Sequence, residues 1–199
     1  MTDDELQSDM VALVGSRICH DLISPLGAIG NGLELLQMMG TGNSPEMALV
    51  SDSVETAAVR VKLFRLAFGA ASRGQLVGAE EVRAHAARIG QGRIVSRWEV
   101  SGNVDRMTAK LGLLLLLCAE TLMPFGGEVW IDGDAERLLL TASASRLRDS
   151  TDLLDQLTDA AAPLPQAAEV HFPLARIAAA DLGRTISVSR TEAGLRIAA

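Results

Sequence analysis

The chain has 199 residues, of which 48% are hydrophobic, 22% are charged and only 3% are aromatic. That mix is typical of a globular protein with its own core. Because Leu, Ala and Val must fill this core, packed helices are favoured over a β-sandwich. The formal net charge of −7 repels polyanions, so neither nucleic acid nor an anionic membrane surface is an expected partner.

The sequence also predicts the compartment. The longest apolar run, over residues 111–119, is far shorter than the roughly 20 residues that span a bilayer. The acidic start, Met-Thr-Asp-Asp-Glu, has the wrong charge for a signal peptide. The isolated cysteines Cys19 and Cys118 indicate a reducing compartment without a disulfide framework, and no metal-ligand spacing is present. We therefore expect a cytoplasmic protein with no metal site.

Two long amphipathic helices are predicted at the start of the chain. Over residues 5–38, apolar side chains recur at steps of three and four, which indicates one helical stripe. This stripe consists of Val11, Val14, Ile18, Leu22, Pro25, Leu26, Ile29, Leu33 and Leu36. A turn over 40–44 follows, after which Ser44 offers an N-cap and Pro45 fits the first position of a helix that ends at Phe68. Its stripe consists of Met47, Val50, Val54, Ala57, Ala58, Val61, Phe64 and Phe68.

A short connection between two such helices predicts an antiparallel hairpin, which we assign to a first domain over residues 1–73. A bare pair of helices leaves each stripe half covered. The hairpin is therefore expected to pair with a second copy into a dimeric four-helix bundle.

Helices and strands alternate in the remainder, which we assign to a second domain over residues 74–199. The predicted helices cover 79–89, 108–123, 149–159 and 170–182. The predicted strands cover 93–100, 128–132, 138–143, 185–189 and 195–198. These strands suit a mixed sheet with helices on one face, so the fold class is α+β.

His20 is the residue on which we expect the chemistry to depend. At about 100° per residue, Ser16, Ser24, Gly27 and Asn31 fall within about 40° of it, and the apolar stripe is centred on the opposite side of the helix. His20 is thus predicted to point away from the core, as a side chain presented to another macromolecule does. A solvated histidine without a function is the alternative.

The helix around His20 contains residues that weaken it. Pro25 withholds a backbone hydrogen bond and is expected to kink the helix. Gly27, Gly30 and Gly32 each cost about 1 kcal/mol relative to alanine in a helix interior. A bare backbone beside the histidine would let a partner's loops approach. Packing contacts are the alternative explanation for the glycines.

Imidazole is a suitable nucleophile at cellular pH, because a large fraction of it is neutral. It can accept a phosphoryl group from an acyl phosphate and return it. Asp21 is placed to hydrogen-bond one ring nitrogen of His20 and leave the other free, and Arg17 is placed to steady the transferred oxygens or to pair with an acidic partner. Structural roles are expected for the other histidines and the cysteines: His85, His171, Cys19 and Cys118.

The segment from His20 to Leu26, His-Asp-Leu-Ile-Ser-Pro-Leu, resembles the H-box of sensor histidine kinases, in which a His-acidic pair precedes a proline five residues after the histidine. The longer stretch over 16–36 is closer to the ChpT-type histidine phosphotransferases of alphaproteobacteria, and this similarity covers essentially the whole chain. The resemblance implies a helical hairpin followed by a degenerate histidine-kinase-ATPase-like α/β sandwich.

Three nucleotide-binding elements of a histidine kinase are absent from the second half. Cys118 stands where kinases carry the asparagine that helps to hold Mg-ATP, counted back from Pro-Phe-Gly-Gly at 124–127. Residues 141–146, Thr-Ala-Ser-Ala-Ser-Arg, replace the Asp-x-Gly-x-Gly that reads adenine. Residues 169–174, Glu-Val-His-Phe-Pro-Leu, replace the glycine-rich lid. By this resemblance the domain binds no ATP, holds no cofactor, and instead buttresses the bundle and contacts a docked receiver.

The family implies the partners. ChpT-like proteins receive phosphate from the receiver domain of a CckA-type hybrid kinase and pass it to response regulators of the CtrA and CpdR type. The Mg²⁺ and the phosphorylated aspartate belong to those receivers. By the same resemblance, this chain is a phosphotransferase in a multistep phosphorelay, with His20 as phosphoacceptor.

Two alternatives remain open at the level of sequence. One is a degenerate kinase-like module that binds and sequesters receivers without phosphorylation, and the other is an ATP-dependent kinase with an unusual site. On the second helix, Arg60, Lys62 and Arg65 are interpreted as a solvated charged face, with contact to an acidic receiver as the alternative.

Overall fold

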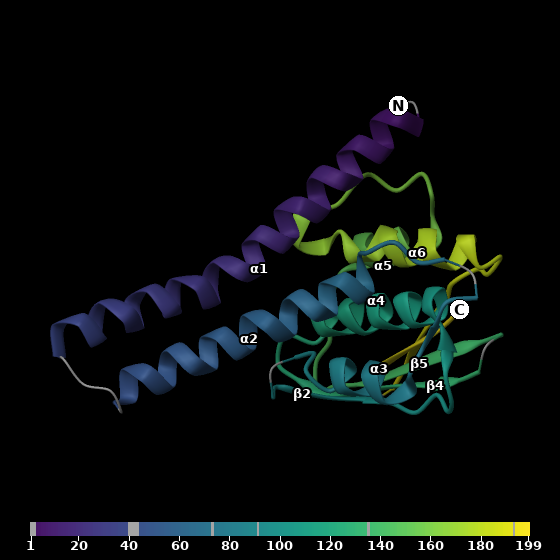
Figure 1. The fold of residues 1–199 in the computed structure, drawn as a ribbon. Coiled ribbons are helices and arrows are strands. Elements are labelled where there is room, and N and C mark those ends of the chain that lie inside the picture. Colours follow the sequence, from purple (N-terminus) through teal and green to yellow (C-terminus); the bar gives the residue numbers. More distant parts are fainter. Residues whose placement is uncertain (1–2, 40–43, 73, 91, 135, 193) are drawn as a thin grey trace. The chain divides into compact units, whose positions relative to one another are not determined.

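Figure 1 shows the computed structural model of the chain, which describes residues 3–39, 44–72, 74–90, 92–134, 136–192 and 194–199. The structure consists of two compact units, Met1–Arg65 and Leu66–Ala199. The first contains helices alone and the second contains helices and strands. The predicted α+β fold class is confirmed. The domain boundary between residues 73 and 74 remains a prediction.

The first unit is the predicted helical hairpin. Helix α1 spans Asp3–Met39 and helix α2 spans Pro45–Ala67, within two residues of the predicted bounds at every end. The Ser44 carbonyl accepts the first helical N–H bonds of α2, from Met47 at 3.1 Å and Ala48 at 3.3 Å. On the described part of α1, the covered positions recur at steps of three and four. They are Val14, Ile18, Asp21, Leu22, Pro25, Ala28, Ile29, Gly32 and Leu36.

Each apolar stripe of the hairpin is only half covered, as expected. On α1, Leu26 and Leu33 are 56% and 48% exposed, although the sequence places both in the stripe. On α2, Met47, Val54 and Val61 are exposed as well. These side chains lie at the edge of their stripes, and a single partner helix covers only part of a stripe more than 100° wide.

The second unit contains a five-stranded mixed sheet and a separate two-stranded one. The strands are β1 Leu76–Val77, β2 Ile94–Trp98, β3 Val104–Asp105, β4 Gly127–Gly133, β5 Leu138–Ser143, β6 Ser187–Thr191 and β7 Gly194–Ala198. The large sheet has the order β2-β4-β5-β7-β6; β2 is parallel to β4, and the other neighbours are antiparallel. The predicted mixed sheet is therefore confirmed.

The helices of the second unit are α3 Ala79–Ala86, α4 Arg106–Leu122, α5 Thr151–Thr158 and α6 His171–Asp181, with a 3₁₀ turn at Ala167–Glu169. Helix α4 packs on β4 and β5, α6 packs on α4, and α5 packs on α6 (Figure 1). Most of α4 is buried, which explains the continuous apolar run in its middle, residues 111–119. The Asp105 side chain caps this helix by accepting a 2.8 Å hydrogen bond from the Met107 N–H.

Two cations at the start of α4 bind the segment that enters the second unit. Arg106, which is buried, donates from Nη1 to the Leu66 carbonyl at 2.6 Å, and Lys110 donates from Nζ to the Gly69 carbonyl at 3.1 Å. Burial, and then the nearby Arg106 charge, lower the pKa of Lys110. Cations at unsatisfied carbonyls beyond a helix C-terminus are stabilising. Both bonds lie within the second unit and fix its first residues to α4.

Every helix and strand that the sequence predicts occurs in the structure, although one strand is shifted along the chain. The structure also contains three short elements that the sequence does not predict. The two-residue strands β1 and β3 and the 3₁₀ turn at Ala167–Glu169 are too short to produce a periodic pattern. The strand predicted over 185–189 is found at Ser187–Thr191 instead. Only Val188 on this edge strand is even partly covered, so the burial pattern gives little information on its register.

Candidate functional site

His20 lies in the middle of α1, in regular helix. Its side chain and those of Ser16 and Arg17 lie outside the described part of the structure. The direction of the imidazole, and the roles assigned to these three residues, therefore remain predictions.

Three residues predicted to share the face of His20 lie on open surface. Ser24, Gly27 and Asn31 are all exposed on α1. At Gly27 an added Cβ would meet no described atom within 4 Å. The turn of α1 beyond His20 is thus accessible to a partner.

The glycines of α1 lie in two different environments. Gly27 and Gly30 are exposed and face open space. Gly32 is buried, and a Cβ there would overlap the Cγ2 atom of Val50 and lie 3.3 Å from the carbonyl oxygen of Glu46 on α2. Packing therefore explains Gly32, whereas no contact with a described residue explains the other two.

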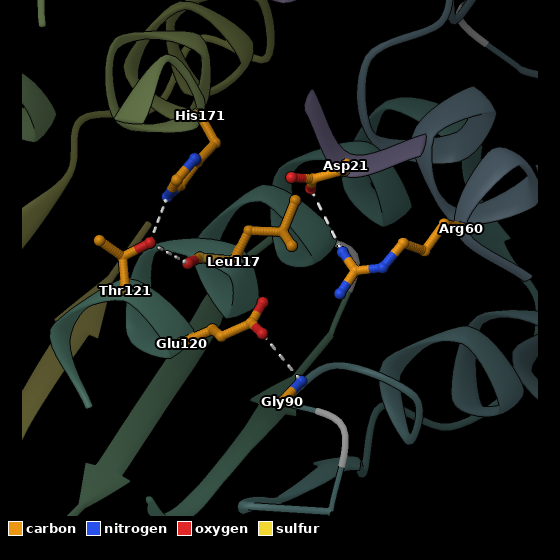
Figure 2. Close-up of polar contacts among 7 residues, drawn as sticks. All are labelled: Asp21, Arg60, Gly90, Leu117, Glu120, Thr121 and His171. Carbon is orange, nitrogen blue, oxygen red and sulfur yellow. Dashed lines mark hydrogen bonds and ion pairs between the residues drawn. The ribbon is translucent and has the colours of Figure 1, made fainter. Parts of the chain in front are cut away.

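The carboxylate of Asp21 lies inside the hairpin. Figure 2 shows Arg60 of α2 reaching toward α1, where its Nη1 donates to Asp21 Oδ2 at 3.2 Å. The Asp21 and Arg60 side chains are only 8% and 22% exposed. Our interpretation of Arg60 as part of a solvated face is wrong, because Arg60 pairs with Asp21. Lys62 and Arg65 are exposed, as expected. The hydrogen bond predicted between Asp21 and His20 remains a prediction.

In the second unit, two of the three segments that the sequence resemblance compares with kinase nucleotide-binding elements contribute to the core. Cys118 is fully buried in α4, between leucines that are also buried. Val170, His171 and Phe172, in the segment that replaces the lid, have no exposed surface. Arg148 pairs with Glu169 at 2.9 Å at the start of that segment.

His171 has the structural role expected of it. Its Nε2 lies 3.0 Å from Thr121 Oγ1, and that hydroxyl donates to the Leu117 carbonyl at 3.2 Å (Figure 2). The direction of the hydrogen bond between the ring and the hydroxyl depends on the tautomer of His171. Nearby on α4, Glu120 accepts a 3.2 Å hydrogen bond from the Gly90 N–H. These bonds hold α4, α6 and the loop after α3 together.

Cys118 should be unreactive in the folded protein. Burial raises the pKa of its thiol well above the usual value, and only the thiolate reacts with alkylating agents. With iodoacetamide at pH 8.5, peptide mass spectrometry should find Cys118 unmodified in native protein and modified in denaturant. Equal modification in both conditions would contradict the packing of α4.

Within the described residues, no group of three or more His, Cys, Asp or Glu side chains is arranged to hold a metal ion. No described helix is both long enough and apolar enough to span a membrane.

Comparison with known proteins identifies the family. Residues 79–194 match the family model of the histidine phosphotransferase C-terminal domain. The chain is 33% identical over 192 residues to the protein phosphotransferase ChpT of Brucella abortus strain 2308, covering 92% of this chain and 91% of that protein. The chain belongs to the histidine phosphotransferase family. A solved structure described as a bacterial phosphotransferase superposes on this histidine phosphotransferase with a TM-score of 0.76 and 32% identity, covering 96% of this chain and 95% of that one.

The two comparisons with whole proteins cover the hairpin as well as the second unit. This histidine phosphotransferase therefore shares both parts of its fold with a named phosphotransferase, and the activity expected from the sequence, a phosphotransferase in a phosphorelay, is supported.

Proposed function

We propose that His20 carries the phosphoryl group, and that this phosphotransferase moves it between the receiver domain of a hybrid histidine kinase and response regulators of the CtrA and CpdR type. The observation that supports this best is the surface next to His20. Ser24, at the end of the H-box-like segment, and Gly27 and Asn31, which follow it, are exposed on successive turns of α1. Such a surface allows a docked protein to approach the backbone closely.

The chemistry is a reversible displacement at phosphorus. The free ring nitrogen of His20 forms a P–N bond while the bond from phosphorus to the aspartyl oxygen of the receiver breaks, which leaves a carboxylate. The reverse reaction phosphorylates the next receiver. The Mg²⁺ that neutralises the phosphoryl oxygens is supplied by the receiver, and this chain contributes no cofactor.

We further propose that the second unit does not bind ATP. This is supported by its packing, because Cys118 is buried in α4 and the segment that replaces the lid contributes Val170 and Phe172 to the core. A nucleotide would need polar groups and space at both positions. The remaining roles of this unit are to support the hairpin and to contact a docked receiver.

We propose that the chain works as a homodimer in the cytoplasm. Leu26 and Leu33 on α1, and Met47, Val54 and Val61 on α2, are exposed and follow each other at intervals of seven residues. Apolar residues at this spacing form the seam of helix bundles. A second copy of the hairpin would cover them and complete a four-helix bundle.

The test is phosphotransfer from a phosphorylated receiver domain. Purified protein and the His20→Ala variant are incubated with the receiver and Mg²⁺, and acid-labile phosphate on this chain is followed, with a parallel reaction that contains ATP alone. We expect label only from the receiver and only with His20 present. Label from ATP alone would indicate a kinase. Binding without label would favour the sequestering module.

Substitution of Gly27 tests the docking surface. Gly27→Gln should leave the fold intact, because nothing lies within 4 Å of the added Cβ, and should raise KM for the phosphorylated receiver. The matched control is Gly30→Gln, which is also exposed and open but lies about 80° from His20 around the helix. If both variants transfer as the unmodified chain does, the partner does not approach at Gly27.

A further inference from the structure

The ion pair between Asp21 and Arg60 connects the two helices of the hairpin directly beside the phosphoacceptor. The residues are 39 positions apart in sequence, and the contact joins Arg60 Nη1 to Asp21 Oδ2 at 3.2 Å. Because the Asp21 carboxylate is 8% exposed, it has lost most of its hydration and needs a cation or donors in the protein. The guanidinium of Arg60 meets this need from the facing helix (Figure 2).

The position of this carboxylate affects the residue before it. Asp21 follows His20 in the same helical turn, about 100° around the axis. The transferred phosphoryl group carries negative charge on its oxygens, so a carboxylate that moved freely at this position would repel it. The guanidinium both neutralises the carboxylate and fixes where it lies.

We propose that Arg60 is a positioning residue for phosphotransfer, which acts by holding Asp21 and without contact to the phosphoryl group or the receiver. The proposal rests on His20 as the phosphoacceptor. It assigns to α2 a part in a reaction for which the H-box-like segment of α1 supplies the nucleophile. The proposal assigns this role to Arg60 and not to Lys62, which is an exposed cation on the same helix.

The first experiment compares Arg60→Met, Arg60→Lys and Lys62→Met in the full chain. With a phosphorylated receiver as donor, Arg60→Met should lower kcat about 10-fold or more, because the carboxylate beside the nucleophile loses both its counter-charge and its fixed position. KM should stay within about twofold, because Arg60 does not contact the receiver in this proposal. Arg60→Lys keeps the charge and should recover most of kcat. Lys62→Met removes an equal charge from an exposed position and should leave kcat unchanged.

The second experiment tests whether Arg60 acts through Asp21. In an Asp21→Asn background there is no carboxylate to hold, so Arg60→Met should have almost no further effect on kcat. The double variant removes both charges, so no buried charge is left unpaired. It is therefore expected to fold even if Arg60→Met alone does not. Circular dichroism checks the folding of each variant.

Three results would overturn the proposal. They are an unchanged kcat in folded Arg60→Met, a rise in KM without a change in kcat, and a double variant with much lower kcat than Asp21→Asn. The assignment of His20 is judged separately, because it depends on whether the unmodified chain is labelled and His20→Ala is not.

Discussion

Gly112→Ala should lower the free energy of unfolding of the second unit by about 1 to 3 kcal/mol. Glycine inside a helix normally costs stability, so an alanine would be expected to help. Here the helix packs against the indole of Trp98, and an added Cβ would lie 2.7 Å from Cη2 and overlap Cζ3 of that ring. Trp98 is 1% exposed and fully enclosed, so the ring cannot move without shifting its neighbours.

Tryptophan fluorescence during urea unfolding measures this effect, because both tryptophans, Trp98 and Trp130, lie in the second unit. The matched control is Gly78→Ala, in the same unit, where φ is −65° and no atom lies within 4 Å of the added Cβ. Gly78 is the N-cap of α3, so Gly78→Ala should cost up to about 1 kcal/mol from the weaker capping by alanine, with no steric overlap added. If Gly112→Ala unfolds at the same urea concentration as this control, Trp98 does not pack on α4 as described.

Gly32→Ala should destabilise the hairpin by about 1 to 2 kcal/mol, since overlap with Val50 opposes the gain in helix propensity. Gly30→Ala is the matched control. It lies two residues earlier in the same helix, with open space around it, and should stabilise α1 by up to about 1 kcal/mol. The two substitutions are chemically identical, so opposite signs can arise only from the contact with α2.

Thermal unfolding followed by circular dichroism distinguishes these variants. The melting temperature should fall for Gly32→Ala and rise or stay constant for Gly30→Ala. Adding Val50→Ala to Gly32→Ala removes the overlapping methyl group and should restore part of the loss. Equal melting temperatures for the two single variants would show that α1 and α2 do not approach at Gly32.

The helices of this protein could be predicted because their patterns are long and periodic. Helix α1 was located within two residues at each end, since the stripe from Val11 to Leu36 repeats over many turns. The two-residue strands β1 and β3 contain no complete period, so no sequence pattern distinguishes them from loop. These two strands pair with each other across almost 30 residues of sequence, so their pairing depends on the fold of the second unit.

The candidate site was only partly predictable. A local motif identified His20, and helical geometry identified Ser24, Gly27 and Asn31 as neighbours on an open face. Arg60 was misassigned because its partner, Asp21, lies on another helix, and a single-helix pattern contains no information on how the two helices face each other. The same limit applies to Gly32, whose packing role depends on Val50 across the hairpin.

The measurement that tests the central claim most directly is the location of the phosphoryl group. The chain is labelled with a phosphorylated receiver and Mg²⁺, digested at neutral to alkaline pH, and sequenced by mass spectrometry. We predict one acid-labile phosphoryl group, on His20. Phosphate on His85 or His171, or phosphate that survives acid treatment, would contradict the assignment of His20 as the phosphoacceptor.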